Sequence, residues 1–223
     1  MPIYLNILFP NDIELNIWHV TESVSFFSEH QEWYEQEQTW IESIHEKRRL
    51  EYLASRYLIY TRLRPNRKLP IIKDEFGKLR FEESDRFLSI SHSGLYSAFV
   101  FGPKEVGVDI QIYENKILRI LEKFLSKTEL EWIHQFTDSE QKIKNSTLLW
   151  TAKEAIYKAH GKRGIQFNKQ ILLSFEGHKL KSGELSLQDQ SIDYAFNYEL
   201  EEDFVWLVAH HIEQPDYFID DFL

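Results

Sequence analysis

The order of the secondary-structure signals constrains the fold of this chain more than any other feature. Apolar residues recur at steps of three and four over about residues 28–63, which predicts helix, and short apolar segments between turns predict strands over residues 71–110. Helical signals then return over residues 126–160, followed again by strand signals up to residue 211. Helices followed by strands, twice in one chain, are typical of an α+β fold.

Signals at the ends of elements locate several boundaries. Pro65 ends the first helical segment, Ser126 and Glu129 have the spacing of a capping box, and Gly161 ends a second long helix. We therefore predict two similar α+β halves, residues 1–105 and 106–223. The expected elements are strands 3–9 and 14–20, one helix or two over 28–63, strands 71–73, 79–81, 87–91, 96–101 and 106–110, helices from 126 and over 139–160, and strands 171–175, 185–187, 194–200 and 204–211.

The bulk composition is that of a globular protein with an ample core. The chain has 223 residues, of which 43% are hydrophobic, and it contains no cysteine, which excludes disulfides and thiolate metal sites. Its apolar segments have the length of strands, so we expect neither a signal peptide nor a membrane span and predict a cytoplasmic protein. The net charge of −10 argues against a nucleic-acid-binding protein.

Positive charge is nevertheless concentrated in residues 41–80. This segment has eleven Lys and Arg residues against five Asp and Glu residues, in a chain whose total charge is −10. A basic region on an acidic protein indicates an anionic ligand or partner at one place. For any one of these side chains, a solvated helix face is the plainer explanation.

The helical segment 150–158 brings a carboxylate and two lysines together. Glu154 and Lys158 are four residues apart and lie on one helix face, with Lys153 at its flank and Trp150 one turn earlier. On their own, Glu154 and Lys158 would be interpreted as a surface ion pair.

A second carboxylate ends an apolar strand segment. Asp109 follows the apolar residues 106–108, where a carboxylate is costly to bury without a partner, and it either caps a turn or binds a cation. Gly107 would allow a backbone or a ligand to approach closely. Mg²⁺ commonly binds one or two carboxylates together with waters and substrate phosphate oxygens. We therefore predict Asp109 and Glu154 as Mg²⁺ ligands, with Gln111, on the strand face of Asp109, adding an oxygen or orienting a water.

Hydroxyls and a histidine are adjacent in residues 91–93 (Ser-His-Ser), where they would donate to phosphate oxygens. A Ser-His-Asp triad is an alternative, but neighbouring Ser and His residues do not readily hydrogen bond to each other, and no Gly-x-Ser-x-Gly motif occurs. Zinc is disfavoured because the pair His210-His211 lacks His-Glu-x-x-His spacing, and there is no Walker-type phosphate loop. The residues alone favour Mg²⁺-dependent phosphate chemistry.

Together these segments resemble the motifs of 4′-phosphopantetheinyl transferases of the larger, pseudo-dimeric Sfp type. Residues 106–111 resemble Gly-[Ile/Val]-Asp-[Ile/Val]-Glu, and residues 150–158 match Trp-x-x-Lys-Glu-Ala-x-x-Lys. Four further elements occur in the family's order: 48–56 (the N-terminal arginine motif), 76–78 (Gly-Lys-Pro), 90–93 (Ser-His-Ser) and 124–129 (Phe-[Phe/Leu]-Ser-x-x-Glu). The resemblance implies the fold of that family, two similar α+β halves that form a pseudo-dimer, for which a monomer suffices.

The resemblance also implies an activity. Enzymes of this family transfer 4′-phosphopantetheine from coenzyme A to a serine of an apo acyl or peptidyl carrier protein, giving the holo carrier protein and adenosine 3′,5′-bisphosphate, with Mg²⁺. By position, Asp109, Glu154 and Gln111 would bind the metal, and Glu154 would also deprotonate the carrier serine. The remaining implied roles are phosphate binding by Lys158 and His92, support of the phosphates by Lys153, and coenzyme A contacts by Arg56 and Lys78 at the 3′-phospho-adenosine end and by Ser91 at the nucleotide.

Two positions depart from the family pattern. Gln111 replaces a second acid, so we predict that activity survives with a lower metal affinity, which Gln111→Glu would raise. Leu79 replaces the proline that follows Gly-Lys, which weakens the assignment of Lys78. The alternatives are a carrier-protein-binding homologue with weakened catalysis, and another Mg²⁺-dependent nucleotide or phosphoryl transferase.

The carrier protein itself is the expected partner, without nucleic acid or membrane. Fatty-acid, polyketide and nonribosomal-peptide carriers all remain open. Phe124, Leu125 and Trp132 would either dock a carrier helix or, more simply, belong to the core.

Overall fold

The computed structural model of this protein describes residues 3–63, 71–82 and 85–212. Pro65, which was expected to end a helix, and the basic residues Arg64, Arg67 and Lys68 lie outside these residues. The first half contains β1 (Ile3–Leu8), β2 (Glu14–His19), α1 (Val24–His30), α2 (Glu35–Ser43), α3 (Glu46–Leu63), β3 (Ile71–Lys73), β4 (Leu79–Phe81), β5 (Phe87–Ser93) and β6 (Tyr96–Gly102).

The second half begins with a strand and a group of helices. It contains β7 (Val106–Ile112), the 3₁₀ helix η1 (Asn115–Arg119), α4 (Leu121–Phe124), α5 (Lys127–His134), α6 (Ser139–His160), α7 (Phe167–Gln170), β8 (Ile171–Glu176), β9 (Lys179–Ser186), β10 (Ser191–Leu200) and β11 (Phe204–His211). The fold is therefore α+β in both halves, as predicted.

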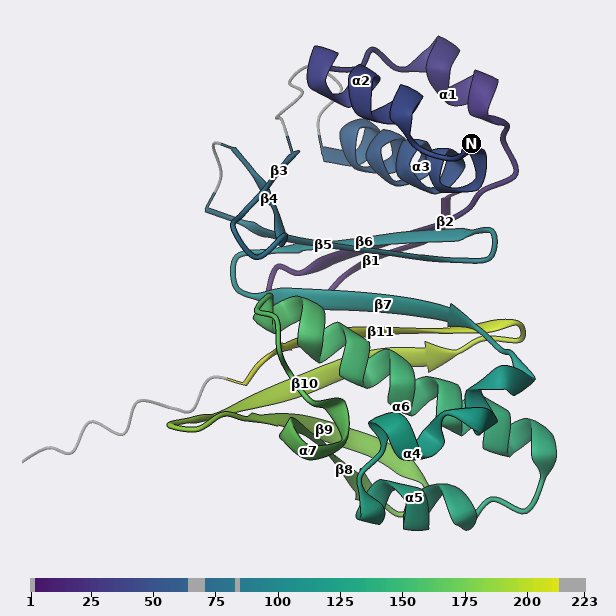
Figure 1. The fold of residues 1–223 in the computed structure, drawn as a ribbon, viewed down its shortest axis with the longest axis vertical. Coiled ribbons are helices and arrows are strands. Elements are labelled where there is room, and N and C mark those ends of the chain that lie inside the picture. The colour runs from purple at the N-terminus through teal and green to yellow at the C-terminus, as the bar shows by residue number, and fades with distance from the viewer. Residues whose placement is uncertain (1–2, 64–70, 83–84, 213–223) are drawn as a thin grey trace, which may run out of the picture.

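Two antiparallel sheets are stacked between helices (Figure 1). The first sheet has the order β1-β2-β6-β5-β4-β3 and the second the order β7-β11-β10-β9-β8. One core packs α1 and α3 on the first sheet, a second lies between the two sheets, and a third packs α6 on the second sheet. This arrangement explains why the middle of β2 is buried on both faces. Ile17 packs into the core between the two sheets, whereas its neighbour Trp18 packs into the core that contains α1 and α3.

Three serines of β5 join the two sheets. Their hydroxyls accept amide hydrogens of β7, an edge strand of the second sheet, so that side chains take the place of backbone pairing at this edge. We call these contacts the β5–β7 junction: Val108 N to Ser89 Oγ (3.1 Å), Ile110 N to Ser91 Oγ (3.3 Å) and Ile112 N to Ser93 Oγ (3.1 Å).

Strand β7 packs closely against α6 because position 107 is glycine. A Cβ atom on Gly107 would lie against the carbonyl oxygen of Ala155 and 2.6 Å from the nitrogen of Ala159. The expectation that Gly107 permits a close backbone approach is confirmed. Since side chains alternate along a strand, Val108 faces the core between the sheets, whereas Asp109 shares the face of Gly107, toward α6.

The predicted elements are largely confirmed, but the short helices η1, α4 and α7 were not predicted, and β10 begins three residues before the expected Tyr194. Two further differences have a physical reason. Residues 28–63, expected to form one helix or two, belong to three helices, because Trp33 and Ile44, which belonged to the apolar period, pack into the core from the segments between helices. Strand β9 begins six residues before the expected Leu185, since Gly183 interrupts the apolar pattern where Ile156 of α6 approaches.

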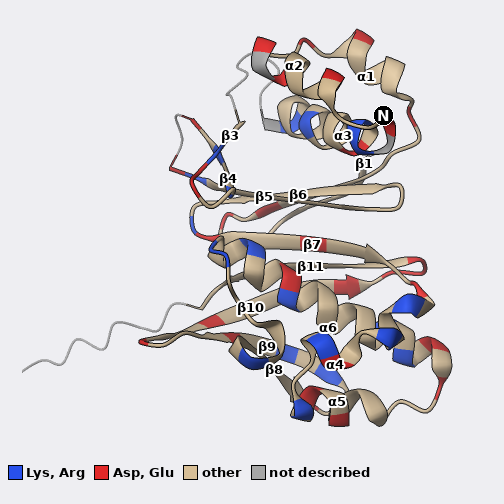
Figure 2. Cartoon of the chain, viewed as in Figure 1, with Lys and Arg blue, Asp and Glu red and all other residues tan. Residues whose placement is uncertain are grey.

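Charge is distributed unevenly over the helices. Figure 2 shows acidic residues on α1 and α2 and basic residues on α3, which begins the basic segment. No helix within residues 3–63, 71–82 and 85–212 is long and apolar enough to cross a membrane.

Candidate active site

Asp109 is the most constrained acid at the β5–β7 junction. Its side chain is buried and has three hydrogen-bonding partners. Ser91 Oγ donates to Oδ1 at 2.6 Å, Lys158 Nζ lies 2.7 Å from the same oxygen, and Gln111 Nε2 donates to Oδ2 at 3.0 Å. The cost of burying this carboxylate is offset by a cation and two neutral donors.

Glu154 and Lys158 lie one turn apart on α6 and face Asp109. Burial and the negative charge of Asp109 raise the pKa of Glu154 from 4.5 to about 7, and the positive charge of Lys158 opposes this rise. Among the residues that the structure describes, none hydrogen bonds or forms an ion pair with Glu154, whereas Lys158 also donates to Ser91 Oγ at 2.9 Å. The site thus contains two neighbouring carboxylates and a single ammonium between them.

His92 of β5 is paired with a helix of the first half, and the charges of Asp109 and Lys158 act on it. Its Nδ1 lies 3.5 Å from the carboxylate of Glu51 on α3, and its side chain is 47% exposed. Burial lowers the pKa of His92, as do the charges of Lys158 and Arg48, while those of Glu51 and Asp109 raise it. Glu51 and Arg48 were not predicted as site residues, although both belong to the arginine motif.

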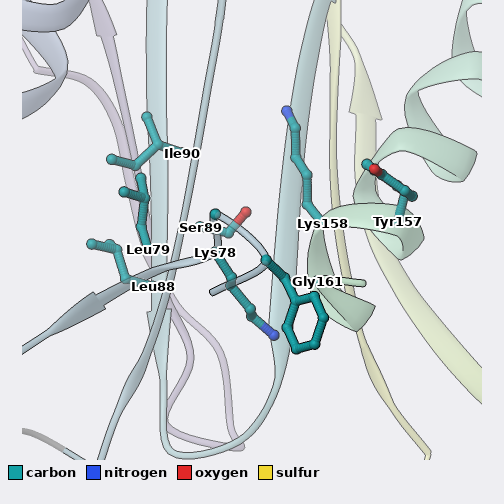
Figure 3. A pocket seen from close by; sticks show the side chains of 10 residues that line it. Lys78, Leu79, Leu88, Ser89, Ile90, Tyr157, Lys158 and Gly161 are labelled. Atoms are coloured by element: carbon teal, nitrogen blue, oxygen red, sulfur yellow. The ribbon is translucent and has the colours of Figure 1, made fainter. Parts of the chain in front are cut away.

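A cavity of about 180 Å³ adjoins Lys158. Figure 3 shows that its labelled residues come from the β3–β4 hairpin, from β5 and from the end of α6. Ser89 and Lys158 lie on its walls, and Lys78 extends in the direction opposite to Lys158 (Figure 3). A second cavity of about 270 Å³ continues along the hairpin and shares Lys78 and Gly161 with the first. An elongated anionic ligand would fit along this surface.

Lys78 lines both cavities, but its ammonium group has partners in the protein. It donates to the carbonyl oxygen of Ala159 at the end of α6 and lies 3.7 Å from Glu105. Burial lowers the pKa of Lys78. The side chain therefore ties the β3–β4 hairpin to α6, and its backbone and stem form the cavity wall.

Lys153 is not part of this site, which corrects the expectation that it supports the phosphates. Its side chain is fully buried, and its ammonium donates to the carbonyl oxygens of Phe167 (2.9 Å) and Ile171 (2.6 Å). It also forms an ion pair of 2.8 Å with Glu129, which accepts the amides of Ser126 and Leu173. The buried pair joins α5, α6 and β8, so the lysine next to Glu154 is structural.

Arg56 also lies away from the cavities. It is buried on α3, where its Nε is 3.8 Å from Glu37 of α2 and its guanidinium lies over the ring of Tyr52 at 4.7 Å. The expectation of a contact with the 3′-phospho-adenosine end therefore does not fit its position. Arg48, whose charge acts on His92, is the α3 arginine beside the site.

An apolar groove of about 600 Å³ borders Glu154. Trp150, predicted to wall this helix face, lines it together with Tyr157 and Phe167, with ring centroids of Phe167 5.8 Å from Trp150 and 5.6 Å from Tyr157. Phe124 also lines it but is buried, as are the other members of the patch considered for docking, Leu125 and Trp132. Their core role is the one the structure supports.

The donor set fits a divalent cation of the Mg²⁺ type. Glu154 is a partly buried carboxylate without a hydrogen-bonding partner in the described part of the chain, and its raised pKa reflects its burial first and the nearby Asp109 second. A divalent cation would compensate both charges with the oxygen ligands it prefers. Gln111 offers its Oε1, which accepts from Ser93 at 3.4 Å. The described residues contain no cluster of three His, Asp or Glu side chains, because Gln111 is not an acid.

Comparisons with known proteins point to one superfamily. Residues 105–212 match the model of the 4′-phosphopantetheinyl transferase superfamily. The chain is 32% identical over 112 residues to the 4′-phosphopantetheinyl transferase gsp of Aneurinibacillus migulanus, and 33% identical over 84 residues to a putative 4′-phosphopantetheinyl transferase of Synechocystis sp.. These matches cover 50% and 36% of this chain and 46% and 34% of the relatives, so the chain spans about half or less of the curated relatives it matches.

A solved structure was also matched. The holo-[acyl-carrier-protein] synthase of Thermotoga maritima is 17% identical with a TM-score of 0.38, over 49% of this chain and 64% of that one. The family match covers β7 with Asp109 and α6 with Glu154 and Lys158. Over residues 105–212, this chain is therefore similar to the 4′-phosphopantetheinyl transferase superfamily.

Proposed function

We propose that this protein transfers the 4′-phosphopantetheine group of coenzyme A to a serine of an apo carrier protein, with Mg²⁺. The observation that carries the proposal is the convergence of Asp109, Glu154 and Lys158 with Ser91 and His92 at the β5–β7 junction, beside a cavity. Similarity to the 4′-phosphopantetheinyl transferase superfamily over residues 105–212 supports the reaction class. The proposal adds coenzyme A as the donor, Mg²⁺ as the metal and a carrier protein as the acceptor.

Asp109 and Glu154 are the proposed Mg²⁺ ligands, and Gln111 contributes an amide oxygen or orients a water. When bound, the metal would neutralise charge on the pyrophosphate of coenzyme A and on the phosphate that leaves. The residues fit this role because one carboxylate already has a cationic partner in Lys158, while the other has none among the described residues.

The cavities along the β3–β4 hairpin are the proposed nucleotide site. Phe76, Leu79 and Leu88 supply apolar walls for a base, and Lys158 stands at the end that faces the carboxylates. Arg48 supplies positive charge next to that end, on the side of α3, and His92 supplies a ring N–H donor. Coenzyme A bound in this way would present its pyrophosphate between Lys158 and His92.

The reaction requires a base and stabilisation of phosphate charge. The oxygen of the carrier serine attacks the phosphorus atom that bears the pantetheine group, and its proton passes to Glu154, directly or through a water. The bond from that phosphorus to the bridging oxygen breaks, and adenosine 3′,5′-bisphosphate leaves with the electron pair. Lys158 and His92 bind the phosphate oxygens as charge builds on them.

The apolar groove beside Glu154 is the proposed approach of the carrier serine. Trp150, Tyr157 and Phe167 form an aromatic wall next to the carboxylate, and Lys123 is the cation on its rim. A carrier segment that presents apolar side chains and acidic neighbours would fit this surface.

An intact-mass assay tests the proposal. The protein is incubated with coenzyme A, Mg²⁺ and several apo carrier proteins, and each carrier is expected to gain one phosphopantetheinyl group as adenosine 3′,5′-bisphosphate appears. Coenzyme A binding without modification of any carrier would instead favour a carrier-binding homologue with weakened catalysis, for which Gln111 is the only motivating residue. Turnover of other nucleotides without carrier modification would favour a different Mg²⁺-dependent transferase.

A further inference from the structure

The hydroxyl of Ser91 has no hydrogen-bonding capacity left for a ligand. A serine hydroxyl offers one donor hydrogen and two acceptor positions. Ser91 donates to Asp109 Oδ1 at 2.6 Å and accepts from the amide of Ile110 at 3.3 Å and from Lys158 Nζ at 2.9 Å. The residue is 4% exposed. An oxygen of a bound phosphate would need a donor, and the single donor of Ser91 is already directed at Asp109.

Ser91 is also the residue of the first half that hydrogen bonds to Asp109 of the second half. It belongs to the first sheet, whereas Asp109 and Lys158 belong to β7 and α6 of the second half. Its contact to Oδ1 fixes one oxygen of Asp109, and the Gln111 amide fixes the other. The orientation of the Asp109 carboxylate is therefore set by a side chain from the other half of the protein.

Ser89 is a natural comparison for Ser91. It lies two residues earlier on the same strand, is 5% exposed, and accepts the amide of Val108 at 3.1 Å, just as Ser91 accepts the amide of Ile110. Within the described residues, however, the Ser89 hydroxyl hydrogen bonds to no carboxylate and no lysine. The two serines thus make the same contribution to the β5–β7 junction but differ at the carboxylate.

We propose that Ser91 is a positioning residue that fixes the Asp109 carboxylate for a divalent cation, and that its hydroxyl is not a ligand of the nucleotide. This inference rests on the proposed function, because it takes Asp109 as a metal ligand. It revises the role that the resemblance implied for Ser91. Partners that orient a metal ligand typically change metal affinity by about 10- to 100-fold when removed.

The test separates metal affinity from coenzyme A affinity. Calorimetric titration with Mn²⁺, in the absence of coenzyme A, is applied to the full chain and to the Ser91→Ala and Ser89→Ala variants. The dissociation constant of the metal should rise about 10- to 100-fold in Ser91→Ala and stay unchanged in Ser89→Ala. Coenzyme A binding measured with a chelator present should be the same in Ser91→Ala and in the unmodified protein. Melting temperatures should fall in both variants, and further in Ser91→Ala, because Ser89 loses one bond of the junction whereas Ser91 also loses its bonds to Asp109 and Lys158.

Three results would overturn the inference. One is an unchanged metal dissociation constant in Ser91→Ala, and another is a loss of coenzyme A affinity in chelator, which would make the serine a nucleotide ligand. The third is a loss of metal affinity in Ser89→Ala equal to that in Ser91→Ala, which would assign the effect to the junction as a whole. If Ser91→Ala does not fold, Ser91→Cys, with its weak donor, takes its place with the same expected result. Failure of the unmodified protein to bind Mn²⁺ would overturn the proposed metal site as well, which distinguishes the two failures.

Discussion

Lys153 and Glu154 are neighbours in the chain, but their side chains serve different parts of the molecule. Lys153 enters the core and forms a 2.8 Å ion pair with Glu129, whereas Glu154 faces Asp109 at the β5–β7 junction. Because successive residues of an α-helix are about 100° apart, α6 can supply an anchor and a site residue from consecutive positions. The two lysines of the motif in residues 150–158 are therefore not equivalent.

Replacing the two lysines by methionine should separate their roles. Lys153→Met leaves the buried Glu129 without its cation and should lower the free energy of unfolding by about 3–5 kcal/mol. Lys158→Met should remain folded, because Asp109 keeps Ser91 and Gln111 as donors, but should lose about 10²- to 10³-fold in transfer rate. Chemical denaturation and the transfer assay measure the two effects. Equal stability of both variants would contradict a structural Lys153.

The pKa of Glu154 gives the metal-free protein a defined pH dependence. Because burial and Asp109 raise this pKa from 4.5 to about 7, the folded state binds more protons than the unfolded state between these values. The contribution of Glu154 to the free energy of unfolding is fully present below pH 4.5 and is lost as the pH rises through about 7. In chelator at pH 8, Glu154→Gln should therefore be more stable than the unmodified protein by about 1–3 kcal/mol, discounted for partial exposure.

Denaturation curves at pH 5 and pH 8 measure this difference. The gain should shrink toward zero at pH 5, where Glu154 is largely protonated in the folded protein, and other titrating groups cancel in the comparison. A Glu154→Gln variant that is equally stable relative to the unmodified protein at both pH values would contradict the raised pKa.

Gly107 should be intolerant of any side chain. The Cβ of Gly107→Ala would meet the backbone of α6 at Ala155 and Ala159, and backbone atoms cannot move aside as a flexible side chain can. We expect a loss of about 3 kcal/mol, the upper part of the range for overpacking, together with weaker metal binding, since β7 would move away from α6. Gly164→Ala is the matched variant on a loop, where a Cβ meets nothing within 4 Å but the φ of +88° adds some backbone strain. A Gly107→Ala protein as stable as Gly164→Ala would refute the close packing.

Gln111 is the position at which this site differs most from the family pattern. Gln111→Glu would replace the donor to Asp109 Oδ2 with a third carboxylate. In the absence of metal, the three acids repel and the protein should be less stable, whereas Mg²⁺ should bind more tightly. Thermal shifts with and without Mg²⁺ measure both effects. An unchanged shift on adding Mg²⁺ would count against a ligand role for Gln111.

Much of the fold followed from local signals in the chain. The hairpin strands 71–73 and 79–81, the strand 204–211 and the helix 139–160 with its end at Gly161 have the predicted bounds, because period and turn residues define them locally. The capping box at Ser126 and Glu129 is present as expected. The positions of the two breaks in the first helical segment were not predicted, because Trp33 and Ile44 keep the helical spacing although they lie in the connections between helices.

The sequence predicted only those neighbours in the candidate site that follow from the periodicity of a single strand or helix. The alternation in β7 places Asp109 and Gln111 on one face, and the four-residue step places Glu154 with Lys158. The side chain of Lys153 points into the core because it pairs there with the buried Glu129, which lies 24 positions earlier on another helix. A local sequence pattern does not identify a partner so far away in the chain. The same holds for Arg56 with Glu37 and for His92 with Glu51.

The most direct test is the single-turnover rate of carrier modification as a function of Mg²⁺. The unmodified protein should reach a saturating rate with Mg²⁺ and none in chelator. Asp109→Asn and Glu154→Gln should be slower by about 10³-fold or more at saturating metal, whereas Glu199→Gln, the same change at an exposed position of β10, should keep the full rate. Transfer at an undiminished rate by Asp109→Asn or Glu154→Gln, or by the unmodified protein in chelator, would contradict a metal-dependent site at the β5–β7 junction.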